Sequence, residues 1–131
     1  MALTKTKLKH LRSALEERRA DIEGDLGQMD EELRSIGMEQ DNERGGLGNH
    51  MAEDGSNLME AERISTISAD LRDVVTQITS AVERIDDGTY GQCQRCGNPI
   101  NEERLEAFPY VAHCIECQTF LERQSALRAG H

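Results

Sequence analysis

The four cysteines of this 131-residue chain form two C-x2-C pairs, and their spacing points to a metal site. Cys93 and Cys96 make the first pair, and Cys114 and Cys117 make the second, with 17 residues between the pairs. Two turns of this kind present four thiolates to one Zn²⁺ ion, and the spacing lies in the range typical of zinc sites. A four-Cys site leaves no position for water or substrate, so we expect one structural Zn²⁺ ion.

Two other interpretations of the cysteines are weaker. Two disulfides or a redox C-x-x-C pair would require an oxidising compartment or a βαβ pattern, and the sequence has neither a secretory signal nor such a pattern. His113 precedes Cys114 and is an alternative ligand, although four thiolates already complete the site. Gly97 follows Cys96 and permits the tight backbone turn that such a pair needs.

Two amphipathic stripes precede the cysteines and must position them. The first stripe repeats every seven residues, at Leu8, Leu15, Ile22, Met29 and Ile36. The second alternates steps of three and four residues, at Ile64, Ile67, Leu71, Val74, Ile78, Ala81 and Ile85. These patterns predict two helices of about 30 residues, each about 45 Å long. We expect them to fold back as an antiparallel hairpin within one chain; the alternative is pairing between two chains.

Glycines and capping residues indicate where the two predicted helices begin and end. Glycines crowd residues 37–56, which we interpret as the loop at the tip of the hairpin. Thr4 or Thr6 is the expected N-cap of the first helix, and Asn57 with Glu60 resembles a capping box for the second. Gly88 is the expected C-cap of that second helix.

The sequence therefore predicts an all-α fold in two domains. Residues 1–88 form the helical hairpin, and residues 89–131 form a four-Cys zinc finger followed by a short C-terminal helix.

Composition excludes several classes of function. Asp and Glu number 25 against 15 Lys and Arg, so the formal net charge is −10, which disfavours non-specific binding to DNA or anionic membranes. No segment has the roughly 18–20 apolar residues of a membrane span, and we expect a cytoplasmic protein. No catalytic triad, phosphate-binding loop or open metal site is present, so an enzyme is not expected.

The cysteine region closely resembles the zinc finger of the DksA/TraR family. The similarity lies in residues 90–100, 104–109 and 114–118, which surround the four cysteines. The order of a long hairpin, a four-Cys finger and a short terminal helix also agrees, so the resemblance extends over residues 5–128. It implies a bacterial transcription regulator that binds RNA polymerase, inserts its hairpin into the secondary channel and does not bind DNA directly.

The resemblance also locates a tip, where this chain differs from the family pattern. Better-known members have D-x-x-D-x-A at the tip, and His50, Glu53 and Gly55 occupy those positions here. Asp54 lies beside Glu53, so carboxylates remain available. We expect Glu53 and Asp54 to form the working tip; the alternative is an ordinary solvated turn.

A second difference concerns the alarmone ppGpp. In several family members, basic side chains near the base of the hairpin and the finger help to bind it. The matching positions here are Gln77, Phe108 and Gln118, none of them cationic. A multiply charged phosphate ligand prefers Arg or Lys, so we expect a weak or absent response to ppGpp.

Two alternative functions remain open from the sequence. A zinc-ribbon nucleic-acid binder would use Arg95, Arg104 and nearby aromatic residues, although acidic residues of the finger offset this charge. A zinc-capped coiled-coil adaptor would dimerise through the apolar stripes, whereas the hairpin interpretation predicts a monomer.

Overall fold

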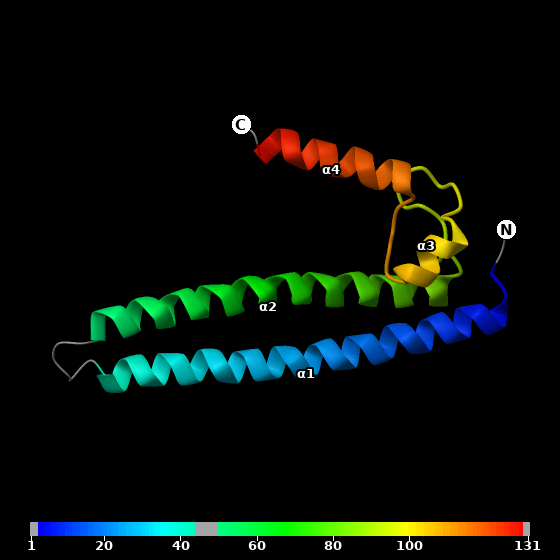
Figure 1. Ribbon diagram of the computed structural model, residues 1–131. Coiled ribbons are helices and arrows are strands. Elements are labelled where there is room, and N and C mark those ends of the chain that lie inside the picture. Colours follow the sequence, from blue (N-terminus) through cyan, green and yellow to red (C-terminus); the bar gives the residue numbers. More distant parts are fainter. Residues whose placement is uncertain (1–2, 44–49, 130–131) are drawn as a thin grey trace. The chain divides into compact units, whose positions relative to one another are not determined.

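The computed structural model describes the backbone of residues 3–43 and 50–129 and the side chains of residues 3–37 and 55–129. Four helices follow one another in this part of the chain (Figure 1): α1 (Lys5–Glu43), α2 (His50–Asp87), α3 (Glu102–Ala107) and α4 (Ile115–Ala129). Over the same residues the only β pairing is an isolated antiparallel bridge between Gln92 and Pro99. The predicted all-α fold is confirmed. None of the described helices combines the length and apolarity needed to span a membrane.

Packing divides the chain into two compact units. One unit comprises residues 19–75, and the other comprises the residues up to Arg18 together with those from Thr76 onward. The unit that contains the cysteines therefore also contains the first turns of α1 and the last turns of α2. The boundary predicted between residues 88 and 89 marks a change in sequence character and stays a prediction.

Within the unit of residues 19–75, α1 and α2 pack through their apolar stripes. Ile22 and Ile64 are buried. Ser68 is only 1% exposed, although it lies beside the predicted stripe, and its hydroxyl donates to the sulfur of Met29 at 3.3 Å. This hydrogen bond satisfies a buried polar group and explains how serine occupies a seam position.

Within the other unit, α1 and α2 also pack through apolar residues. Leu15, Ile78 and Ala81 are each at most 1% exposed. Arg12 of α1 donates through Nε to a carboxylate oxygen of Asp86 near the end of α2, at 3.0 Å. Low residue numbers on α1 thus pair with high numbers on α2, which confirms the antiparallel hairpin within one chain (Figure 1).

The helix ends confirm part of the predicted capping. The hydroxyl of Thr4 accepts from the backbone N–H of Lys7 at 3.1 Å, so Thr4 is the N-cap of α1. Gly88 has φ +81°, a left-handed conformation that ends α2 and that glycine adopts without strain. The capping box at Asn57 is wrong, because Asn57 lies inside α2.

The loop predicted over residues 37–56 is also shorter than expected. Helix α1 continues through Gly37 to Glu43, and α2 begins at His50. A single glycine costs a helix only about 1 kcal/mol, and the strong helix formers that follow Gly37 offset that cost. Helices of 39 and 38 residues are each about 57 Å long at about 1.5 Å per residue.

The buried seam yields a stability prediction. We expect Ile78→Ala to lower the free energy of unfolding by about 2–5 kcal/mol, because it leaves a cavity at a fully buried position. Leu58→Ala is the control, since Leu58 is 55% exposed and its truncation is expected to cost no more than about 0.5 kcal/mol. Urea unfolding followed by circular dichroism measures both values. Equal losses in the two variants would contradict the assignment of the seam.

Candidate metal centre

The four cysteine sulfurs gather at one point. The Sγ atoms of Cys93, Cys96, Cys114 and Cys117 all lie within 4.8 Å of one another, and those of Cys96 and Cys114 are 3.8 Å apart. Zn–S bonds of about 2.3 Å place the sulfurs of a tetrahedron about 3.8 Å apart. The residues present therefore fit one Zn²⁺ ion, and among the described residues His113 is not part of the cluster.

The first cysteine pair is shaped by a short hairpin of backbone. The N–H of Cys93 donates to the carbonyl of Asn98 at 2.8 Å, and the N–H of Gly97 donates back to the carbonyl of Cys93 at 2.9 Å. Gly97 has φ +78°, a conformation that residues with a Cβ rarely adopt. The turn predicted from Gly97 is therefore confirmed, and it aims both thiols of the pair in one direction.

The second cysteine pair lies at the start of α4. The carbonyl of Cys114 accepts from the N–H of Gln118 at 2.9 Å, and Cys117 sits on the first turn of the helix. The N–H of Gln94 donates to the carbonyl of Ala112 at 2.8 Å and joins the two halves of the finger. Cys93 and Cys117 are buried, whereas Cys96 is exposed, so the centre is closed on one side and open to solvent on the other.

The environment of Cys93 favours its thiolate. Burial of the sulfur disfavours the charged thiolate and raises the pKa. Hydrogen bonds from the backbone N–H groups of Cys96, Cys114 and Arg95 favour the thiolate, and together they lower the pKa by more than burial raises it. The pKa of the Cys93 thiol is lowered to about 5. The pKa of the neighbouring Cys117 thiol is raised instead, to about 12: the hydrogen bond from Arg95 lowers it, but burial and hydrogen bonds with the other three thiols raise it by more. A metal, which is bound by thiolates, must therefore displace the proton of Cys117.

Arg95 contacts the centre in a way that the sequence analysis did not predict. Its guanidinium Nη1 donates to the Sγ of Cys117 at 3.5 Å. The same guanidinium lies over the ring of Phe120, 3.8 Å from the centroid. The signal in the sequence was an arginine inside the first C-x2-C pair and an aromatic residue three positions after the last cysteine.

A small core supports the finger. Tyr90, Ile100 and Leu105 are buried, and the Tyr90 hydroxyl donates to the carbonyl of Pro109 at 2.7 Å. Burial of this hydroxyl raises its pKa to about 12. Helix α3, which the sequence analysis did not predict, is capped by the side chain of Asn101 and carries Leu105 into this core.

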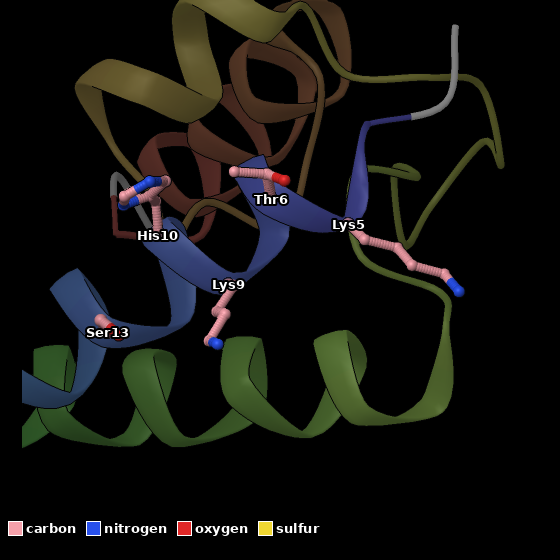
Figure 2. A pocket seen from close by; sticks show the side chains of 5 residues that line it. All are labelled: Lys5, Thr6, Lys9, His10 and Ser13. Carbon is pink, nitrogen blue, oxygen red and sulfur yellow. The ribbon is translucent and has the colours of Figure 1, made fainter.

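Several hollows lie outside the metal centre in the same unit, among them two of about 480 Å³ each. One, of about 480 Å³, follows the first turns of α1 and is lined by Lys5, Thr6, Lys9, His10 and Ser13 (Figure 2). The side chains of Lys5, Lys9 and His10 point in different directions in Figure 2, so they do not converge on a ligand.

The second hollow, also of about 480 Å³, brings Gln77, Phe108 and Gln118 together. Arg104 lines it too, and its Nε donates to the carbonyl of His113 at 3.1 Å. The structure thus gathers the three positions that the sequence analysis matched to ppGpp binding. Glu53 and Asp54, the predicted tip residues, lie outside the residues whose side chains are described.

Comparisons with known proteins agree with this architecture. Residues 88–123 match the family model described as the prokaryotic dksA/traR C4-type zinc finger. General stress protein 16O of Bacillus subtilis is 32% identical over 122 residues, which cover 93% of this chain and 72% of that protein.

A shorter match and a solved structure extend the comparison. The RNA polymerase-binding transcription factor DksA of Caulobacter vibrioides is 40% identical over 53 residues, 40% of this chain and 37% of that protein. The solved structure of transcription factor DksA2 from Pseudomonas aeruginosa has a TM-score of 0.73 at 24% identity, covering 93% of this chain and 88% of that one. The long helical hairpin with a four-Cys finger is therefore a shared fold.

The metal centre predicts a defined zinc content. We expect one Zn²⁺ per purified chain, and Cys117→Ser is expected to remove most of it, because three thiolates leave the tetrahedron incomplete. Elemental analysis after gel filtration measures the content. The control is Ser125→Ala, an exposed change on α4 that leaves all four thiols in place. Full zinc content in Cys117→Ser would contradict the four-thiolate site.

The raised pKa of Tyr90 predicts that the folded state loses stability at high pH. Its pKa is about 12 in the folded chain and about 10 when unfolded, so between these values the folded state holds a proton that the unfolded state has lost. Stability is therefore complete below about pH 10 and falls as the pH rises toward 12. In a Tyr110→Phe background, tyrosinate absorbance is expected to appear near pH 12 before unfolding in urea and near pH 10 after it. The same midpoint in both states would contradict the buried position of Tyr90.

Proposed function

We propose, since this chain belongs to the DksA/TraR family of C4-type zinc finger proteins, that it regulates bacterial transcription by binding RNA polymerase directly. The observation that carries the proposal is the 40% identity, over 53 residues of this chain, to a protein named as an RNA polymerase-binding transcription factor. The zinc centre has a structural role in this function, because four thiolates leave no open position on the metal.

The proposed mode of binding is insertion of the hairpin into the secondary channel of the polymerase. Two supports are available: the length of α1 and α2, about 57 Å each, and the pairing of their apolar stripes within one chain. Because the chain buries its own seam, it acts as a monomer and offers a polar outer surface to the channel wall. The net charge of −10 supports binding to protein rather than to promoter DNA, and the proposed location is the cytoplasm.

The proposed working end is the pair Glu53 and Asp54. Both precede Gly55 near the start of α2, where the family pattern has its acidic tip. Carboxylates at this end can act on the active-centre region through its Mg²⁺ or its basic side chains. His50 replaces one of the usual acids, so Glu53 and Asp54 are the carboxylates proposed to act at this end.

A weak or absent response to ppGpp is part of the proposal. Gln77, Phe108 and Gln118 line one hollow, and amides and an aromatic ring carry no charge to oppose several phosphates. The arginine of this hollow, Arg104, already donates to the carbonyl of His113.

The experiment places a photo-crosslinking amino acid at position 54 and adds the zinc-loaded protein to the RNA polymerase of its own host. We expect crosslinks to the secondary-channel wall or the active-centre loops. A crosslinker in place of Arg128, which is exposed at the end of α4, is the positional control and is expected to miss the active-centre loops.

Transcription in the same purified system tests the residues. Glu53→Ala and Asp54→Ala are expected to reduce the effect on open-complex stability several-fold without weakening polymerase binding. Asp70→Ala removes an exposed acid from the body of α2 and is the matched control. Addition of ppGpp is expected to leave the effect unchanged, and a clear enhancement would contradict that part of the proposal.

The possible results distinguish between polymerase binding, insertion into the channel and the role of the tip. Binding with crosslinks elsewhere would contradict the channel mode and the tip. Absence of binding by the zinc-loaded protein would contradict the function itself. In that case salt-sensitive DNA binding by the full chain would favour the nucleic-acid binder, and a stable dimer in light scattering would favour the coiled-coil adaptor.

A further inference from the structure

Arg95 joins the two halves of the metal centre through its side chain. It lies between Cys93 and Cys96 in the first pair, yet its Nη1 reaches the Sγ of Cys117 in the second pair, at 3.5 Å. Cys117 is 4% exposed, so the sulfur that Arg95 contacts is buried. A guanidinium group therefore lies directly against one of the four metal-binding thiolates.

The charge of the centre explains why a cation matters there. Four thiolates and one Zn²⁺ ion carry a net charge of −2, inside a chain whose formal charge is already −10. Gathering that negative charge at a buried sulfur is costly unless a donor compensates it. A hydrogen bond from a charged donor to a thiolate supplies such compensation, and it is stronger than a bond from a neutral donor.

Phe120 holds the guanidinium in place. The cation lies 3.8 Å from the ring centroid, within the range of a cation–π interaction. Phe120 follows Cys117 by three residues on α4, and residues three apart share a helix face. The helix thus presents the sulfur and the ring side by side. Only a planar guanidinium can lie flat on the ring and also donate from its edge, which a lysine cannot reproduce.

We propose that Arg95 is a positioning residue of the zinc centre: held on the face of Phe120, it donates to the Cys117 thiolate and slows the loss of the metal. This role is independent of polymerase binding. It is a property of this chain's own residues, carried by one side chain from each half of the finger.

The test measures how fast the zinc-loaded full chain releases its metal to an excess of a chromogenic chelator. Groups that support metal ligands typically contribute 10–100-fold to affinity, so we expect Arg95→Gln to accelerate release by about tenfold or more. Arg123→Gln is the matched control, since it removes an exposed arginine from α4. A rate for Arg95→Gln within twofold of the parent, or an equal acceleration in Arg123→Gln, would overturn the proposal.

The ring is tested in the same assay. Phe120→Leu keeps an apolar side chain but removes the cation–π contact, and it is expected to give a smaller acceleration than Arg95→Gln. The double variant is expected to release zinc no faster than Arg95→Gln alone, because the ring acts through the arginine. Fully additive effects would contradict the coupling between the two residues.

A spectroscopic measurement separates this role from general destabilisation. Co²⁺ in place of Zn²⁺ gives thiolate-to-metal charge-transfer bands whose energy depends on hydrogen bonds to the sulfurs. We expect Arg95→Gln to shift these bands and Arg123→Gln to leave them in place. An unshifted spectrum in Arg95→Gln would show that Arg95 acts only through the stability of the fold, and would overturn the proposal.

Discussion

Convergence of four sulfurs on one point is the constraint on which the cysteine-containing unit depends. The finger buries few large side chains, chiefly Tyr90, Ile100 and Leu105. Such a core is too small to offset the conformational entropy of the surrounding loops, so metal binding must supply folding energy. The backbone is built accordingly: Gly97 takes a left-handed conformation, and N–H groups aim at Cys93.

The hairpin, unlike the finger, is stabilised by contacts between apolar side chains. Its seam is a line of aliphatic residues, since no Phe, Tyr or Trp lies in α1 or α2, and its most buried members include Ala81 and Ser68. Aliphatic side chains of moderate size pack along the seam, so many modest contacts replace one large core. A pair of helices can be stable in this way without a thick globular core. This is the property that the proposed insertion into the polymerase channel requires.

The sequence predicted the features that repeat or that obey chemical spacing. Heptads at Leu15 and Ile22 and the double C-x2-C pattern needed no tertiary information, because each is a local rule. Ser68 and Arg95 were missed for the opposite reason. Each depends on a partner distant in the chain: the Met29 sulfur for Ser68 and the Cys117 sulfur for Arg95. The extension of α1 was missed because Gly37 was interpreted as the end of the helix, although a single glycine costs a helix only about 1 kcal/mol.

The placement of charged side chains on the hairpin and the finger bears on the proposed function. The basic residues of the first turns of α1 are partly used inside the chain: Lys7 pairs with Glu102 and Glu106, and Arg12 pairs with Asp86 and Glu16. These exposed pairs contribute little stability each, and they neutralise carboxylates together with cations, so they leave the net charge unchanged. Arg95 is similarly committed to the metal centre and to Phe120. The formal net charge of −10 therefore remains the source of the outer negative field, which disfavours nucleic acid and fits the proposed binding in a basic protein channel.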